Sequence, residues 1–321
     1  KDKSGTRWKF CLIPLGGYVK FFGDRNVFSQ AEQKELLNKY SKEDQNKLFV
    51  TKPLYQRSLI VVAGPVANFI LAIIIFSFIY MFAGKDFTPA QISEVQKDGP
   101  AYTAGIKDGD LILQINKNKV SSLLDVSTYI NASSSSDLEI KILRNNTEID
   151  FKVLAKSIKT KDSLGNTINK KIIGIKISPP NNELNRERLG PASALYYAVK
   201  ETWFVTSASL DFVFAMFKGK GDTTQLGGPI KIAKITGQVA QYGLIAFLSI
   251  TAYISISLGF INLFPIPMLD GGHLMFYAFE KVLGRPLTQK TQEGFFRIGL
   301  FLLIFLMLFT TINDLKDLGI F

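Results

Sequence analysis

Cysteine and histidine are almost absent from this sequence of 321 residues. Cys11 is the only cysteine, so an intrachain disulfide is excluded and the fold has to be stable without one. His273 is the only histidine, which excludes any motif that takes two histidines from this chain. Motifs typical of nucleic-acid binding are also missing, and we expect no nucleic acid among the partners.

Charged residues are missing from three apolar stretches, which cover 58–83, 242–269 and 298–312. A helix needs about 20 predominantly apolar residues to cross the hydrocarbon core of a bilayer. The first two stretches reach this length. The third reaches it when residues 295–297 are added, because the arginine side chain among them extends to the interface. The sequence therefore predicts transmembrane helices over 58–83, 242–269 and 298–313.

Basic residues indicate how these spans are oriented. Residues 1–57 contain 12 Lys and Arg against 6 Asp and Glu, and Lys/Arg-rich flanks stay in the cytoplasm. We therefore expect residues 84–242 to lie outside, the loop 270–297 to be cytoplasmic and the tail 314–321 to end outside. The net charge of +11 then reflects this topology and an attraction to anionic membrane lipid, which we expect as a partner.

The segment between the first two spans consists of short apolar runs separated by turn residues, which is typical of a small, mostly-β domain. Three features stand at the spacing of a bacterial PDZ domain, namely Ala104-Gly105, Gly109-Asp110 and Asn116. Residues 84–180 resemble such a domain. Their expected elements are strands at 90–95, 111–115, 138–143 and 149–153 and helices at 100–104 and 124–131.

A PDZ domain binds an extended peptide along the edge of its sheet. The resemblance therefore implies a peptide or a substrate tail as a partner of this domain, with residues 173–175 as the candidate edge strand. The alternative is a β domain that serves only as a spacer or a size filter.

Two further segments are predicted to touch the membrane without crossing it. Residues 8–22 have strand-like runs around Gly16-Gly17, which predicts a β-hairpin that dips into the membrane surface within the cytoplasmic segment 1–57. Residues 181–241 begin as a polar linker and continue with mixed aromatic and charged residues. We expect membrane-surface helices there rather than a fourth span.

The most informative string is NLFPIPMLDGGH at residues 262–273, where the second span ends. Pro265 and Pro267 each lack a backbone N–H and break a helix. Irregular backbone at membrane depth is tolerated only where protein covers it or where it lines a water-filled cavity. An ionisable residue at this depth, here Asp270, indicates a functional site. Asp270 is either a metal ligand or the cap of a helix beginning at Gly271, and the residues alone leave both readings open.

Three strings occur in the order found in the site-2 protease family of intramembrane zinc metalloproteases. IPLGGYVKFFGD at 13–24 resembles the family's membrane-associated hairpin, AGPVANF at 63–69 resembles its GPxxN motif, and NLFPIPMLDGGH resembles its third signature. The resemblance implies a polytopic α-helical membrane protein with an inserted extracytoplasmic PDZ-like, mostly-β domain. It implies Zn²⁺ as the cofactor, a single-span membrane protein as the substrate, and a bacterial inner membrane with the PDZ domain in the periplasm.

The same resemblance assigns roles to individual residues. Asp270 matches the aspartate of the LDG element, which is a zinc ligand in this family, whereas His273 is expected to support the site without binding the metal. Substrate binding is expected at Asn262 and Pro265, and at Gly16 and Gly17, whose hairpin would hold an unwound substrate. A structural role within the motifs is expected for Gly64, Pro65, Asn68, Gly271 and Gly272.

One part of the family pattern is missing. The family's zinc is held by an HExxH helix, in which two histidines bind the metal and the glutamate is the general base. With one histidine the chain cannot contain this motif, so we expect no catalytic residue and no activity in the chain as given. The sequence starts at Lys1 rather than Met, and we expect the motif in a preceding span that this sequence lacks. A truly inactive relative is the alternative.

The function predicted from the sequence is intramembrane zinc metalloendopeptidase activity in regulated intramembrane proteolysis. A non-catalytic, membrane-anchored PDZ protein that binds or recruits partners is the alternative from another class. A transporter would explain the proline-broken helices but does not fit three spans without repeated halves. An apolar span with HExxH upstream of Lys1 would separate the protease from the scaffold.

Overall fold

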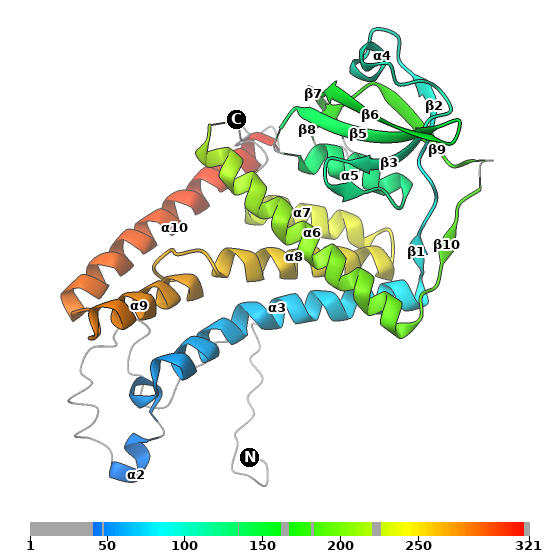
Figure 1. Ribbon diagram of the computed structural model, residues 1–321. Coiled ribbons are helices and arrows are strands. Elements are labelled where there is room, and N and C mark those ends of the chain that lie inside the picture. Colours follow the sequence, from blue (N-terminus) through cyan, green and yellow to red (C-terminus); the bar gives the residue numbers. More distant parts are fainter. Residues whose placement is uncertain are drawn as a thin grey trace.

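The structure is a computed structural model, and it describes residues 41–46, 48–133, 135–161, 167–180, 183–219 and 226–317. The predicted hairpin at 8–22, with Cys11, Gly16 and Gly17, lies outside the described residues. The chain forms a group of long helices with a small β-rich unit above one end (Figure 1).

The helical part consists of long apolar helices and shorter elements that join them. Its elements are α2 (Lys42–Gln45), η1 (Phe49–Thr51), α3 (Leu54–Phe82), α6 (Pro191–Phe217), α7 (Pro229–Ala240), α8 (Leu244–Asn262), α9 (Asp270–Leu283) and α10 (Gln289–Asp317).

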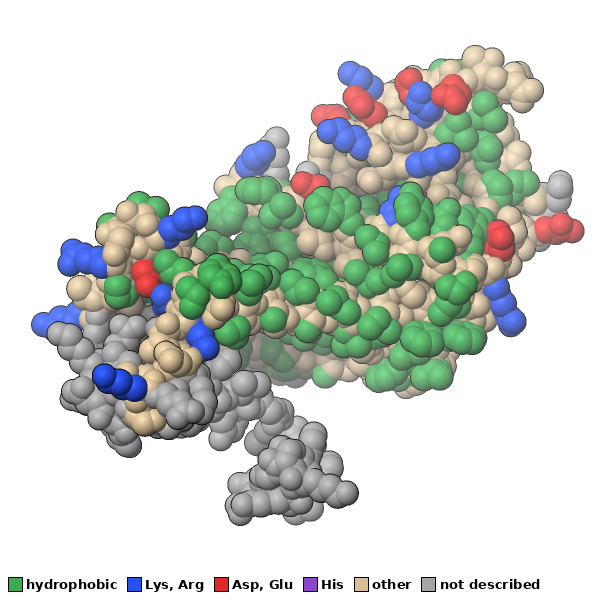
Figure 2. Space-filling model, turned by 60° about the horizontal axis from the view of Figure 1, so that its bottom comes forward, with side chains coloured by type: hydrophobic (Ala, Val, Ile, Leu, Met, Phe, Trp, Pro, Cys, Tyr) green, Lys and Arg blue, Asp and Glu red, His purple; other side chains and the backbone are tan. Residues whose placement is uncertain are grey.

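Three helices are long and apolar enough to span a membrane. They are α3, α8 and the part of α10 at Lys290–Lys316, with mean hydropathies of 2.7, 2.1 and 2.3. Their outer surfaces carry many exposed apolar side chains, seen in Figure 2 as a broad green band with Lys and Arg gathered toward its ends. Such a surface suits a hydrocarbon solvent. The three predicted spans are thus present as helices.

The second span is shorter than the sequence predicts. It ends at Asn262, and residues 263–269 form a turn, because Pro265 cannot donate a backbone hydrogen bond and its ring obstructs the preceding helical turn. The turn is strained at Met268, whose φ of 97° is rare for a residue with a side chain.

The expected cytoplasmic loop 270–297 is mostly helical. It contains α9 and the start of α10, which begins at Gln289 rather than at 298. Phe276 and Phe296 explain the difference, because both are buried and their ring centroids are 5.5 Å apart. The aromatic side chains of α9 and α10 bury each other, and this contact stabilises both helices. The composition of the segment alone predicts a loop.

The β-rich unit is an antiparallel sheet with the strand order β6-β5-β3-β2-β9 and a short β4 beside β3. Helices α4 (Pro100–Ala104) and α5 (Leu123–Ala132) cover it, and a capping box formed by Ser122 and Asp125 starts α5. The strands of the sheet are β2 (Gln91–Val95), β3 (Leu111–Ile115), β4 (Asn118–Lys119), β5 (Asp137–Arg144), β6 (Thr147–Leu154) and β9 (Ile175–Ser178).

The core of the β-rich unit is aliphatic. Ile115, Ile140 and Ile142 are fully buried, and other isoleucine, leucine, valine and alanine side chains surround them. Side chains at alternate positions of a strand lie on the same face of the sheet, so these apolar residues form one buried face. The unit, a PDZ-like domain, therefore has a hydrophobic core of its own.

Two strand pairs lie beyond the elements that the sequence predicts. The hairpin of β7 (Lys156–Lys161) and β8 (Thr167–Ile172) precedes β9. Strands β1 (Lys85–Asp86) and β10 (Arg186–Glu187) pair with each other where the chain enters and leaves the β-rich unit. This short ribbon joins the unit to the helices (Figure 1).

Candidate metal and substrate site

The turn 263–269 packs directly on two helices through glycines. A β-carbon on Gly271 would collide with the carbonyl oxygen of Phe264, and one on Gly272 would lie 2.7 Å from the Cα of Pro267. A β-carbon on Gly299 in α10 would collide with the carbonyl oxygen of Pro267. Only glycine leaves room at these positions, so the backbone of the turn is held between α9 and α10.

The GPxxN segment of α3 lies against the other side of this site. A β-carbon on Gly64 would be 3.3 Å from Oδ2 of Asp270. Farther along, a β-carbon on Gly259 of α8 would be 3.0 Å from the carbonyl oxygen of Pro65 and 3.2 Å from Cβ of Asn68. The fold therefore brings together two motifs that are about 200 residues apart in the sequence.

A hydrogen bond secures the same contact between α3 and α8. Ser255 is buried, and its Oγ donates to the backbone carbonyl of Asn68 at 2.8 Å. The carbonyl of Asn68 belongs to the helix that holds Gly64, so the bond fixes the register between the two spans. Small residues and polar side chains of this kind are typical of close helix packing in membranes.

The carboxylate of Asp270 stands at the start of α9 without a hydrogen-bond donor in the part of the chain that the structure describes. The N-cap of α9 is Leu269, and no side chain caps this helix end. The carboxylate is half-buried. Burial raises the pKa of this carboxyl group, and the nearby His273 partly opposes the shift. A carboxylate in such a place can accept a cation as a partner.

The other predicted site residues differ in exposure and in their neighbours. Asn262 is the last residue of α8 and is half-buried, whereas Pro265 in the turn is exposed. His273 packs its ring near Phe296, with centroids 5.8 Å apart. Gly271 and Gly272 pack on the turn and Gly64 lies beside Asp270, whereas Pro65 and Asn68 contact α8 farther along. Gly16 and Gly17 lie outside the described residues.

The residues that the structure describes can supply one ligand to a zinc ion. Within that part of the chain, no three His, Cys, Asp or Glu side chains lie close enough to hold a metal ion. A catalytic zinc site needs three protein ligands. Asp270 can supply one of them, and its free carboxylate beside Gly64 is suited to that role.

Sequence reasoning missed several residues that shape this site. A β-carbon on Gly299 would make a contact as close as one on Gly271, and a β-carbon on Gly259 would lie 3.0 Å from the carbonyl oxygen of Pro65. Arg57 of α3 forms an ion pair with Glu280 of α9 at 2.7 Å. A glycine within a charge-free helix is the signal that points to Gly259 and Gly299, because glycine lowers helix stability and needs a packing reason.

A separate groove lies in the PDZ-like unit. It encloses about 580 Å³ between α5 and strand β9, with β8 at one end. Val126 and Ile130 of α5 face Ile173, Ile175 and Ile177 across it. Strand β9 ends the sheet and has β2 as its only strand neighbour among the described residues. The predicted edge strand at 173–175 is thus shifted to Ile175–Ser178, because Gly174 has a φ of 76° and interrupts the strand.

Known proteins match almost the whole chain. The sequence model of peptidase family M50 matches residues 1–306. The chain is 37% identical over 317 residues to "Putative zinc metalloprotease Atu1380" of Agrobacterium fabrum, which covers 99% of this chain and 84% of that protein. It is 33% identical over 342 residues to "Metalloprotease MmpA" of Caulobacter vibrioides, which covers 100% of this chain and 85% of that protein.

Among the solved structures, a PDZ domain matches part of the chain. It is the PDZ domain of the SdrC-like protein from Listeria monocytogenes, with 22% sequence identity and a TM-score of 0.23. The match covers 28% of this chain and 88% of that chain.

Proposed function

Given that the chain belongs to peptidase family M50, the site-2 protease family of zinc metalloproteases, we propose that it cleaves single-span membrane proteins within or near the membrane. The observation that carries the proposal is the approach of Gly64 to the Asp270 carboxylate. It joins the GPxxN and LDGG motifs around an oxygen ligand that accepts no hydrogen bond from the described residues.

Asp270 is the zinc ligand in this proposal. Bound zinc supplies a Lewis acid and lowers the pKa of a bound water toward 7. The remaining ligands and the general base belong to an HExxH motif that the 321 residues cannot contain, since His273 is the only histidine. We propose that a segment outside this sequence supplies that motif and packs beside Gly64, which is exposed.

The chain's own residues position the substrate. A peptide bond within a helix is protected by its own hydrogen bonds, so a substrate helix has to unwind before it is cleaved. The carboxamide of Asn262 has no hydrogen-bond partner among the described residues. Asn262 is the last residue of α8, directly before the turn 263–269. It is therefore available to bind the unwound backbone, and the exposed Pro265 in the following turn is proposed to contribute. The hairpin that the sequence predicts at Gly16 and Gly17, outside the described residues, would offer a further strand edge.

The groove between α5 and β9 is proposed to bind an extended peptide, such as the tail of a substrate. Strand β9 offers free backbone groups on its outer edge, and isoleucines 173, 175 and 177 provide an apolar wall. Lys170 and Lys171 also line the groove, together with Lys176, which is paired with Glu94 at 2.6 Å. This combination favours an apolar peptide that carries an acidic group.

The proposed location is the bacterial inner membrane, with the PDZ-like unit in the periplasm. The basic residues before α3 support this orientation. Within the helical part, the ends that carry α2 and α9 lie far from the PDZ-like unit (Figure 1). This arrangement supports the proposal that the two regions face opposite sides of the membrane.

The experiment uses the protein with its HExxH segment, purified in detergent and mixed with a single-span membrane substrate. We expect cleavage that stops when zinc is chelated and returns when zinc is restored. A protein that binds stoichiometric zinc and the substrate but never cleaves it would favour the non-catalytic scaffold instead.

A further inference from the structure

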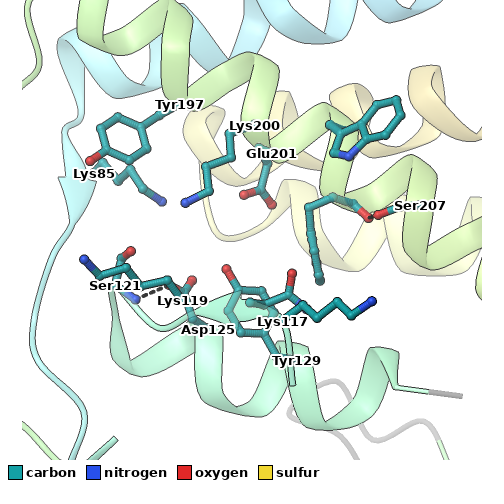
Figure 3. Close-up of a pocket in the computed structure, with 13 residues that line it drawn as sticks. Lys85, Lys117, Lys119, Ser121, Asp125, Tyr129, Tyr197, Lys200, Glu201 and Ser207 are labelled. Atoms are coloured by element: carbon teal, nitrogen blue, oxygen red, sulfur yellow. Dashed lines mark hydrogen bonds between the residues drawn. The ribbon is translucent and has the colours of Figure 1, made fainter. Parts of the chain in front are cut away.

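A second cavity lies between the PDZ-like unit and the helical part, away from Asp270. It encloses about 250 Å³ and is lined by residues of β1, β4, α5 and α6. In Figure 3, Lys200 and Glu201 point from α6 toward α5, and Tyr129 points back from α5. The cavity is thus shared by the two parts of the molecule.

Lysines dominate the charge of this cavity. Two of them come from each side, and none of the four forms an ion pair with a described residue. They are Lys85 and Lys200 from the helical side and Lys117 and Lys119 from the PDZ-like unit. Four lysines line one small space and outnumber the two carboxylates that line it with them, so the cavity has a net positive charge that favours an anion.

The two carboxylates that line the cavity are already engaged with uncharged donors. Asp125 accepts hydrogen bonds from the backbone N–H groups of Ser121 at 2.8 Å and Ser122 at 3.0 Å, where it caps α5. Glu201 accepts one from the hydroxyl group of Tyr253 at 3.0 Å. Lys85 and Lys200 attract the Glu201 carboxylate without forming an ion pair with it among the described residues. With four lysines against two carboxylates, the cavity keeps an excess of positive charge.

Aromatic rings hold Lys85 in position. Its Nζ lies 5.2 Å from the ring centroid of Tyr80, 5.5 Å from that of Tyr197 and 5.9 Å from that of Phe87. Cation–π contacts orient an ammonium group but leave its N–H donors free to bind an anion. The rings of Tyr129 and Phe204, 4.8 Å apart, join α5 to α6 beside the cavity.

The cavity lies close in sequence to the end of the first apolar helix. Lys85 stands three residues after Phe82, the end of the first span. Trp203 on α6 lines the cavity and is 73% exposed. Tryptophan and tyrosine gather at the depth of lipid headgroups, which places the four lysines where anionic lipid phosphates are found.

We propose that this cavity binds an anionic phosphate group, supplied by the headgroup of an anionic phospholipid. Phosphate oxygens would accept hydrogen bonds from Lys85 and Lys200 on one side and from Lys117 and Lys119 on the other. A bound headgroup would therefore join the PDZ-like unit to α6. The inference concerns a lipid site and is independent of the proposed proteolysis.

The test measures retention of phosphatidylglycerol and phosphatidylcholine by the purified 321-residue protein, using native mass spectrometry. We expect the protein to retain phosphatidylglycerol selectively. The double variant Lys85→Gln/Lys200→Gln should bind it roughly tenfold or more weakly, because each lysine near a membrane surface contributes substantially to binding an anionic lipid. Lys117→Gln/Lys119→Gln should weaken binding as well, although both residues belong to the PDZ-like unit.

The control is Lys152→Gln/Lys218→Gln, which removes the same charge from two exposed lysines outside the cavity. It should change retention less than twofold. Equal losses in all three variants, or no preference for phosphatidylglycerol, would overturn the proposal. Inorganic phosphate is added in a second arm. If it displaces the lipid at low millimolar concentration, free phosphate rather than lipid is the source, and the lipid assignment is wrong.

Discussion

Arg57 in the first turn of α3 and Glu280 in α9 form a two-pronged ion pair. The guanidinium nitrogens donate to the two carboxylate oxygens at 2.7 and 3.2 Å, and the side chains are only 8% and 15% exposed. The guanidinium also lies 5.1 Å from the ring centroid of Tyr277. This contact anchors the helix that begins with Asp270 to the helix that contains Gly64, and so supports the geometry of the site.

Glu280→Gln should destabilise the protein by about 3 kcal/mol, because it leaves the Arg57 charge buried without its partner. Arg285→Gln is the control, since Arg285 is exposed on the same side of the molecule. Thermal unfolding in detergent measures both variants. Equal melting temperatures for the two would show that the ion pair contributes little.

Two glycines of α10 should respond in opposite ways to alanine. A β-carbon on Gly299 meets the carbonyl oxygen of Pro267, whereas one on Gly294 meets nothing within 4 Å. Gly299→Ala should cost about 1–3 kcal/mol by displacing the turn 263–269. Gly294→Ala should be neutral or stabilise the helix by up to about 1 kcal/mol. Unfolding curves of the two variants test the packing of the turn, and a tolerated Gly299→Ala would contradict it.

The PDZ-like unit contains a buried ion pair whose strength should depend on pH. Asp110 is 1% exposed, and both of its oxygens lie 2.7 Å from nitrogens of Arg144. Burial alone would raise the pKa of this carboxyl, but the hydrogen bonds from Arg144 and from the Lys107 N–H outweigh it, and the pKa is lowered. The stabilisation is therefore present above the unfolded pKa of about 3.9 and is lost as the pH falls through the lower folded value.

Residues 86–180, expressed alone, should fold and unfold cooperatively without membrane or metal. At pH 7 the melting temperature of Asp110→Asn should lie well below that of the wild type, and the gap should narrow as the pH falls below about 4. Asp137→Asn, at an exposed position, should match the wild type at each pH. A gap that stays constant down to pH 2 would contradict the ion-pair account.

Membrane orientation is tested with single cysteines in a Cys11→Ser background. Thr128→Cys in the PDZ-like unit should react with a membrane-impermeant maleimide in intact spheroplasts. Val282→Cys, which replaces a residue that is 84% exposed at the end of α9, should react only after permeabilisation. The reverse pattern would invert the proposed topology.

The spans and the turn followed from the sequence because their causes are local. A charge-free apolar stretch needs no tertiary information to predict a span. Two prolines close together, Pro265 and Pro267, disfavour a continuous helix, although the single Pro65 lies inside α3. The elements α4 and β3 also match their predicted bounds at Pro100–Ala104 and Leu111–Ile115, since Gly105 and the turn before β3 mark them clearly.

Contacts between distant residues could not be predicted in the same way. Arg57 and Glu280 are 223 residues apart, and nothing in either local pattern identifies the other. The helices at 270–297 depend on burial of Phe276 against Phe296, which composition does not reveal. The contact between Gly64 and Asp270 could likewise be seen only in the structure, although the family resemblance had assigned a role to each residue.

The most direct test of the account is Asp270→Asn in the protein that carries the HExxH segment. The control is Asp211→Asn, at an exposed position of α6. Bound zinc is counted by mass spectrometry, and cleavage of a single-span substrate is followed in the same samples. We predict that Asp270→Asn loses both, with zinc affinity falling by more than roughly 100-fold, the upper end for residues that only support a metal ligand. Folding and membrane insertion should persist. An Asp270→Asn protein that keeps full zinc and full cleavage would contradict the assignment of Asp270 as a zinc ligand.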